Sequence, residues 1–120
     1  MILIVEDDPQ VARLISLVLQ RNGYKGEVVE DGGVALERIR AANPQMVFAD
    51  LHVKGMNGEA LCTLVKKEPI TSGIPFVILS GDRDIAEKAR ACGADEYLGK
   101  PFEFDELIRL VKRYVHNENS

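Results

Sequence analysis

The sequence lacks the features that would place a protein in or across a membrane. No apolar run approaches the roughly 18 residues that a helix needs to span a bilayer. The first apolar run, Met1 to Val5, is too short for a secretory signal and has no basic leader. We therefore expect neither a membrane contact nor a cleaved signal peptide.

Cysteine is also scarce, and acidic residues outnumber basic ones. The two cysteines, Cys62 and Cys92, lack the spacing of a metal site, so we expect reduced structural thiols and a cytoplasmic protein. Lysine and arginine total 15 against 19 acidic residues, which gives a formal net charge of −4. Binding to nucleic acid needs a concentrated basic face. We therefore expect no direct contact with nucleic acid.

No linker, internal repeat or low-complexity segment divides the 120 residues. That length suits one domain with a core of normal size. We expect a single domain over residues 1–120, with no output domain in this chain.

Short apolar runs alternate with helical patterns, five of each. The runs are Ile2–Val5, Glu27–Val29, Met46–Ala49, Phe76–Leu79 and Tyr97–Leu98. The first, third and fourth runs are apolar throughout, which is typical of parallel strands buried on both faces. The first helical pattern runs from Pro9 to just before Gly23. The other four cover about 33–42, 58–68, 84–92 and 103–116. The alternation predicts an α/β fold, a doubly wound five-stranded parallel sheet of five βα units.

Two of the expected helices carry a clear apolar stripe with helical spacing. The first stripe consists of Val11, Leu14, Ile15, Val18 and Leu19. The stripe of the last helix consists of Phe104, Leu107, Ile108, Val111 and Val115. We expect both stripes to face the sheet, and we expect Asp8 to cap the first helix rather than to bind a metal.

Polar side chains stand where the expected strands end. Glu6 and Asp7 follow the first strand, Asp50 the third, Ser80 the fourth and Lys100 the fifth. The carboxyl ends of parallel strands share one edge of a sheet, and ligands bind there. Clustered carboxylates attract a hard cation such as Mg²⁺, and a carboxylate can act as a covalent nucleophile in aspartyl-phosphate chemistry. The set predicts a magnesium-assisted phosphoryl acceptor with Asp50 as the nucleophile.

Four segments in order resemble the receiver domain of response regulators in two-component signalling, including the chemotaxis regulators, over essentially the whole chain. The segments are residues 2–8, residues 47–51 together with 55–58, residues 78–81, and residues 93–102. Each segment alone is weak, but four in this order and spacing are highly specific. The resemblance implies a flavodoxin-like (βα)5 fold with strand order 2-1-3-4-5.

The resemblance also implies a set of metal ligands. Asp50 would be the phosphorylated aspartate and a ligand, Asp7 a direct ligand, and Glu6 a ligand acting largely through a metal-bound water. The backbone carbonyl of His52 would complete the protein ligands. The expected ion is Mg²⁺, with Mn²⁺ as a possible substitute.

The remaining roles that the resemblance implies concern charge and switching. Lys100 would supply the countercharge and be followed by a cis bond to Pro101. Ser80 would be the switch hydroxyl, and Tyr97 the aromatic side chain that turns inward when the switch closes.

The implied function is a signalling switch that phosphorylates and dephosphorylates itself, without a separate turnover reaction on a small molecule. The phosphoryl donor would be a phosphohistidine on a sensor histidine kinase or a histidine phosphotransfer protein. A downstream effector would bind the face formed by the fourth helix, the fifth strand and the fifth helix. The chain would be a monomer or a phosphorylation-dependent dimer.

Other interpretations stay open from sequence alone. A degenerate receiver would act only as a phosphorylation-independent docking module, and a phosphohydrolase would need a second carboxylate where this chain has His52. Ser80 could simply start a turn, Tyr97 could be a half-buried strand aromatic, and Lys100 an ordinary surface lysine. The side chain of His52 is expected in a solvated loop rather than on the metal.

Overall fold

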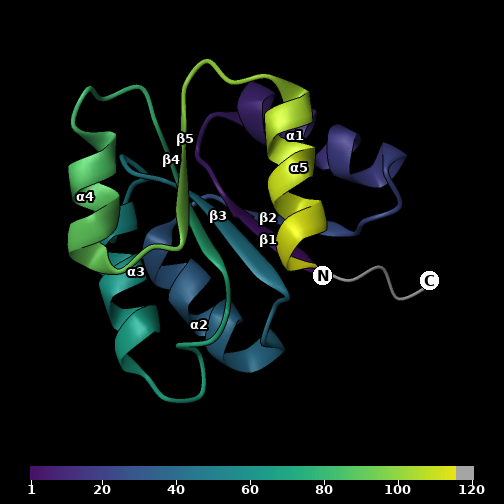
Figure 1. Cartoon of the computed structure of the whole chain (residues 1–120). Coiled ribbons are helices and arrows are strands. Elements are labelled where there is room, and N and C mark those ends of the chain that lie inside the picture. Colours follow the sequence, from purple (N-terminus) through teal and green to yellow (C-terminus); the bar gives the residue numbers. More distant parts are fainter. Residues whose placement is uncertain (116–120) are drawn as a thin grey trace.

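All strands lie parallel in one five-stranded sheet with the order β2-β1-β3-β4-β5, as expected. The computed structural model describes residues 1–115 (Figure 1). The strands are β1 (Ile2–Val5), β2 (Gly26–Val29), β3 (Met46–Asp50), β4 (Phe76–Ser80) and β5 (Glu96–Gly99). Each lies within about two residues of its predicted position.

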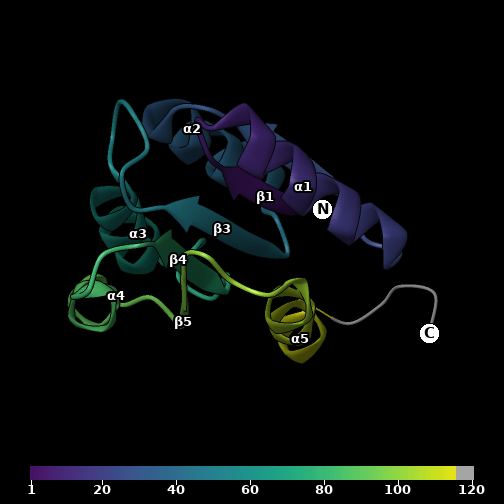
Figure 2. The ribbon, with the colours of Figure 1, turned by 90° about the horizontal axis from the view of Figure 1, so that it is seen from above.

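The helices are divided between the two faces of the sheet. They are α1 (Pro9–Arg21), α2 (Gly32–Ala42), α3 (Gly58–Lys67), α4 (Ile85–Cys92) and α5 (Phe104–Tyr114). Seen from above, α1 and α5 cover one face, and α2, α3 and α4 cover the other (Figure 2). The last helix was predicted to reach His116, which lies outside the described residues.

The central strands are buried on both faces because helices cover each side. Successive side chains of a strand point to opposite faces. Leu3, Val47 and Ile78 therefore pack toward α2, α3 and α4. Ile4 and Phe48 pack toward α1 and α5. This double burial explains why the runs that form β1, β3 and β4 are continuously apolar rather than alternating.

The start of α1 follows the prediction. The Oδ1 atom of Asp8 accepts hydrogen bonds from the backbone N–H groups of Gln10 (2.9 Å) and Val11 (3.5 Å), and Pro9 is the first helical residue. Asp8 therefore satisfies N–H groups that the first helical turn leaves unpaired. None of the helices in residues 1–115 is long and apolar enough to cross a lipid bilayer.

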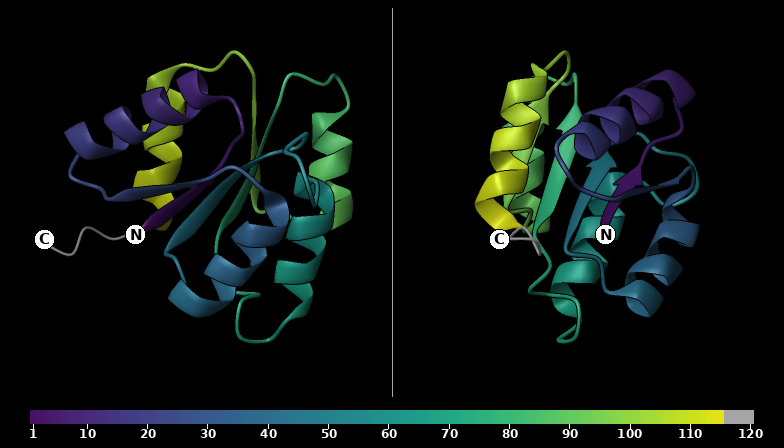
Figure 3. Two further views of the ribbon diagram at one scale, coloured as in Figure 1. Left: turned by 180° about the vertical axis from the view of Figure 1, so that it is seen from behind. Right: turned by 90° about the vertical axis from the view of Figure 1, so that its right-hand side faces the viewer.

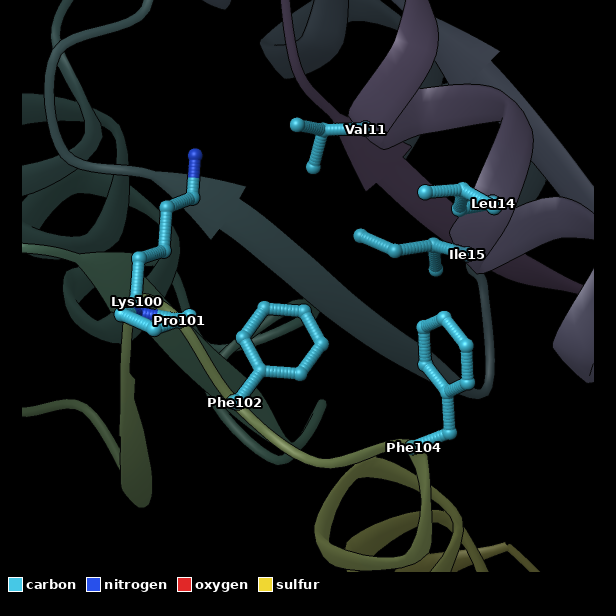
Figure 4. Close-up of a pocket in the computed structure, with 7 residues that line it drawn as sticks. All are labelled: Val11, Leu14, Ile15, Lys100, Pro101, Phe102 and Phe104. Atoms are coloured by element: carbon cyan, nitrogen blue, oxygen red, sulfur yellow. The ribbon is translucent and has the colours of Figure 1, made fainter.

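The apolar stripes of α1 and α5 are only partly buried, which corrects the prediction for two residues. Leu14 is 49% exposed and Phe104 is 45% exposed, whereas Ile15 and Leu107 are buried. Each stripe is wider than the line along which its helix touches the sheet. Its outermost residues therefore lie beside a groove between α1 and the segment that precedes α5 (Figure 4).

Candidate functional site

The carboxyl ends of four strands bring the predicted residues to one edge of the sheet. Val5 pairs with Ala49, so the next residues, Glu6 and Asp50, lie side by side. Asp50 pairs with Leu79, the residue before Ser80. The parallel register thus brings together residues that are far apart in sequence, because neighbouring strands end at the same edge of the sheet. The loops that leave β4 and β5 at this edge are at the top of Figure 1.

Three carboxylates meet at this edge. One carboxylate oxygen each of Glu6, Asp7 and Asp50 can be chosen so that all lie within 4.8 Å of one another. Glu6 and Asp50 are buried, and Asp7 is more exposed. The backbone N–H of Lys54 donates to Asp7 Oδ2 at 3.3 Å. Like charges at this spacing repel, so the cluster favours positive charge beside it.

Lys100 supplies part of that charge. Its Nζ lies 2.6 Å from Glu6 Oε1 and 3.6 Å from Asp50 Oδ1. The Lys100–Pro101 peptide bond is cis, as the resemblance predicted. Burial raises the pKa of the Glu6 carboxyl and the Asp50 charge adds to that rise, while the hydrogen bond from Lys100 opposes it. Lys100 is therefore bound into the site and is not an ordinary surface lysine.

One oxygen of the cluster is left without a partner. Glu6 Oε2 is fully buried and accepts no hydrogen bond from any residue that the structure describes. An orphaned buried carboxylate oxygen is costly unless water or a cation satisfies it. Lys100 pairs with only two of the three carboxylates, so the donor set fits a hard divalent cation that retains some of its waters.

Ser80, the last residue of β4, is almost fully buried. Its Oγ accepts a hydrogen bond from the backbone N–H of Asp82 at 2.9 Å. In this state the hydroxyl stabilises the turn that leads to α4, which is the turn-forming alternative predicted from sequence. Ser80 follows Leu79, which pairs with Asp50, so the backbones of Ser80 and Asp50 lie close together at this edge.

Asp82 is a residue of the site that the sequence argument missed. Its Oδ2 lies 2.7 Å from His52 Nε2 and 3.1 Å from Lys88 Nζ. The contacts with His52 and then Lys88 lower the pKa of the Asp82 carboxyl. The His52 ring is exposed as expected, but it is paired as well as solvated. The only signal in the sequence was the position of Asp82, two residues after Ser80.

Tyr97 lies on the edge strand β5 and is 47% exposed. Its position agrees with the alternative interpretation of Tyr97 as a half-buried strand aromatic. The side chain therefore stands at the surface of the face formed by α4, β5 and α5 in this state of the molecule.

The loop after β3 is held close to Asp50 by a glycine. A Cβ atom added to Gly58 would lie only 2.6 Å from the backbone oxygen of Asp50, so a larger residue would push this loop away. The preceding residue, Asn57, caps α3 by accepting a hydrogen bond from Ala60 N–H at 2.9 Å. The first turn of α3 thus packs directly against the strand end that carries Asp50.

An apolar groove of about 460 Å³ adjoins the carboxylate cluster. It is lined by Val11, Leu14, Ile15, Lys100, Pro101, Phe102 and Phe104. The rings of Phe102 and Phe104 face α1 across the groove, and Lys100 stands at one end (Figure 4). Sequence reasoning did not predict this groove, because its two walls come from opposite ends of the chain.

Comparisons with known proteins agree with this geometry. Residues 2–112 match the family model described as the response regulator receiver domain. The chain is 36% identical to the DNA-binding response regulator MtrA of Mycolicibacterium smegmatis, covering 98% of this chain and 52% of that protein. This chain thus spans about half the length of such relatives.

Solved structures show the same fold. A protein described as a response regulator from Chloroflexus aurantiacus superposes with a TM-score of 0.90 at 36% identity, covering 94% of both chains. The receiver domain of the sensor histidine kinase PA1611 from Pseudomonas aeruginosa, with a magnesium ion coordinated in its active site cleft, has a TM-score of 0.87 at 25% identity and 94% coverage of both chains.

The name of MtrA bears on one prediction. It describes a DNA-binding protein, which conflicts with the expectation that this chain makes no direct contact with nucleic acid. That expectation came from the net charge of this chain, which does not describe the rest of a longer protein such as MtrA. The match over residues 2–112, together with the relative at 36% identity, shows that this chain belongs to the response regulator receiver domains of two-component signalling.

Proposed function

We propose that this receiver domain accepts a phosphoryl group on Asp50 from a phosphohistidine, in a Mg²⁺-dependent reaction. The donor would be a sensor histidine kinase or a histidine phosphotransfer protein. The observation that carries the proposal is the cluster of Glu6, Asp7 and Asp50 within 4.8 Å, with Lys100 against two of them. A nucleophilic carboxylate, further carboxylates that can hold a divalent cation, and a countercharge are what such a reaction needs in one place.

The metal would be held by Asp7, Asp50 and the backbone carbonyl of His52, with Glu6 acting through a metal-bound water. The orphaned Glu6 Oε2 supports this assignment. When bound, Mg²⁺ or Mn²⁺ would supply positive charge to the phosphoryl oxygens. A receiver domain 25% identical to this chain is described with magnesium in its active site cleft, which supports the same ion here.

Asp50 would act as the nucleophile. One of its carboxylate oxygens forms a bond to phosphorus while the N–P bond of the phosphohistidine breaks, and the electron pair returns to the imidazole nitrogen. Lys100 Nζ, 3.6 Å from Asp50 Oδ1, lies where a cation can pair with the incoming phosphoryl oxygens. Most of the catalysis is then positioning and charge stabilisation, which suits a site built from strand ends.

Phosphorylation would change the contacts of Ser80. Its hydroxyl now accepts a hydrogen bond from Asp82, and it would instead donate to the phosphoryl group. Releasing Asp82 loosens the turn before α4, and Tyr97 would turn inward from its exposed position. The face of α4, β5 and α5 would then present a different surface to an effector, as a monomer or as a phosphorylation-dependent dimer. Hydrolysis of the acyl phosphate would reset the switch without a separate substrate.

The donor protein would dock in the apolar groove between α1 and the segment before α5. A phosphohistidine must approach Asp50 closely, and the groove ends at Lys100 beside this residue. Leu14 is half exposed on its rim, so replacing it removes little core packing. We expect Leu14→Glu to slow transfer from a phosphorylated donor protein at least tenfold. The rate with acetyl phosphate should stay unchanged, because this small donor needs no docking surface.

The decisive experiment is intact mass measurement after incubation with Mg²⁺ and acetyl phosphate. Wild type should gain one phosphoryl group, and EDTA should prevent the gain. Asp50→Ala should gain none, whereas Asp105→Ala, which removes an exposed aspartate in the first turn of α5, should behave as wild type. If wild type also stays unmodified with a phosphorylated histidine kinase or phosphotransfer protein, a phosphorylation-independent docking module becomes the better explanation.

A further inference from the structure

Two buried cysteines meet on the face of the sheet opposite the apolar groove. Cys62 lies in α3, and Cys92 is the last residue of α4. The Cys62 thiol donates to the backbone oxygen of Cys92 at 3.4 Å, and the Cys92 thiol donates to the backbone oxygen of Ala89 at 3.4 Å. The helices that carry them pack against each other and stand next to one another in the left panel of Figure 3. Residues 30 positions apart in sequence are thus in direct contact.

We propose that Cys62 and Cys92 form a redox-sensitive dithiol, which a small hydroperoxide oxidises to a disulfide that ties α4 to α3. Nothing in the phosphoryl-acceptor chemistry uses either thiol. The inference therefore stands independently of the proposed function. It goes beyond the sequence-based expectation of reduced structural thiols.

The environment of the pair makes the two thiols unequal. The neighbouring Cys62 thiol lowers the pKa of the Cys92 thiol to about 7, although burial and the charge of Glu59 oppose this. The neighbouring Cys92 thiol, together with burial, raises the pKa of Cys62; the charge of Lys66 works against this rise and that of Asp95 adds to it. Cys92 is therefore the thiol of the pair that ionises more readily. The thiolate is the nucleophile in cysteine oxidation.

The oxidation balances with a hydroperoxide as the only oxidant. The Cys92 thiolate attacks the peroxide O–O bond, which gives a sulfenic acid on Cys92 and releases the alcohol, or water when the oxidant is hydrogen peroxide. The Cys62 sulfur then attacks the Cys92 sulfur. A disulfide forms, and the hydroxyl leaves as water with the Cys62 proton. Two thiols and one hydroperoxide thus give one disulfide, one alcohol and one water.

Burial selects the oxidant. Cys62 has no exposed surface, and Cys92 is 6% exposed. A bulky disulfide such as oxidised glutathione cannot reach either sulfur without local unfolding, whereas a hydroperoxide can reach Cys92. The Lys66 side chain packs beside the end of α4 next to Cys92. Its Cγ lies 3.5 Å from where a Cβ of Gly93 would stand. The Lys66 ammonium is held by Asp95 at 2.7 Å and by the backbone oxygen of Ile74 at 2.8 Å.

The position of Cys92 allows the small adjustment that a disulfide requires. It ends α4, and the next residue, Gly93, has a φ of +84° that stops the helix. A residue at a helix end can shift its backbone without breaking hydrogen bonds in the middle of the helix. Disulfides have a narrow range of geometries, so this freedom favours closure at the end of α4 over closure at its centre.

The test uses the reduced wild-type chain, treated with hydrogen peroxide and then unfolded and alkylated with N-ethylmaleimide. Before oxidation both cysteines should be alkylated. After oxidation the alkylation of both should fall in parallel, and treatment with dithiothreitol should restore it. A peptide map without reduction should show Cys62 linked to Cys92. Cys62→Ala should form no disulfide, and its Cys92 should oxidise more slowly than in wild type, because the variant loses the Cys62 thiol that lowers the pKa of Cys92.

A comparison without any variant keeps the test independent of folding defects. The same oxidation in urea should give the 62–92 disulfide at least tenfold more slowly, since the unfolded chain separates the two sulfurs. Three results would overturn the proposal: loss of only one thiol in wild type, disulfides only between two molecules, or equal rates in the folded and unfolded chain.

Discussion

The buried ion pair of Lys100 offers the sharpest test of the electrostatics at this edge of the sheet. Lys100→Met keeps most of the length of the side chain and removes its charge. The Glu6 carboxylate would then lie in a fully buried position without its 2.6 Å partner, and Asp50 would lose a cation at 3.6 Å. No neighbouring cation in the described residues is recorded within ion-pair distance of Glu6 to take its place.

Burial decides the size of the effect. Removing one partner of a buried ion pair costs about 3–5 kcal/mol, because the remaining charge stays desolvated. The Lys100 side chain is 26% exposed, so water compensates part of the loss, and we expect about 3 kcal/mol in metal-free buffer. For a domain of this size that corresponds to a fall in Tm of roughly 10 °C.

The loss should depend on pH with a definite sign. The folded-state pKa of Glu6 is raised above its ordinary value of 4.5, and removing the Lys100 hydrogen bond raises it further. A carboxyl with a raised folded pKa disfavours folding when it is ionised. The penalty of Lys100→Met is therefore greatest above the folded pKa of Glu6, declines as pH falls through that pKa, and disappears as pH approaches the unfolded value.

Urea denaturation followed by circular dichroism at pH 7 and pH 5, in EDTA, measures these effects. The double variant Glu6→Gln/Lys100→Met should recover most of the stability lost by Lys100→Met. The control is Arg38→Met, which breaks an ion pair with Glu27 of the same 2.6 Å length but with both side chains more than a third exposed. This control should stay close to wild type. Equal losses for Lys100→Met and Arg38→Met, or no recovery in the double variant, would refute the reasoning.

Three further outcomes follow from the site and the core. Mg²⁺ at 100 times its Kd should stabilise wild type by about 2.7 kcal/mol in a thermal unfolding assay, and Asp7→Asn should abolish that gain, whereas retention of the full gain would place the ion elsewhere. Gly58→Ala should lower the free energy of unfolding by about 1–3 kcal/mol and slow phosphorylation by acetyl phosphate, because its methyl group would stand 2.6 Å from the Asp50 backbone oxygen. A wild-type phosphorylation rate and a wild-type midpoint of urea denaturation would mean that the loop after β3 moves aside without cost. Phe48→Ala should cost about 3–5 kcal/mol in urea denaturation without displacing the site residues, since Phe48 is fully buried toward α1 and α5, and a loss below 1 kcal/mol would mean that the core collapses around the gap.

The sequence determined the elements and their order because these depend on local patterns. Continuous apolar runs at Ile2–Val5 and Phe76–Leu79 indicated strands covered on both faces, and the structure confirms this burial. The capping role of Asp8 needed only the residues that follow it. The strand order 2-1-3-4-5 came from the resemblance, since periodicity does not record which strands are neighbours. That the site residues share one sheet edge follows from parallel strands alone.

Only the tertiary structure decided which side chains touch. Lys100 pairs with Glu6, 94 residues away, and the sequence had assigned these residues to separate tasks. Leu14 belongs to a helical stripe that predicts burial, yet it lines a groove because the packing of α1 covers only part of that stripe. Cys62 and Cys92 are unremarkable in sequence and meet because α3 and α4 pack together. The period of the apolar residues shows which side of a helix or strand a residue occupies. The distance between side chains on different elements depends on how all the helices pack against the sheet, which local periodicity does not record.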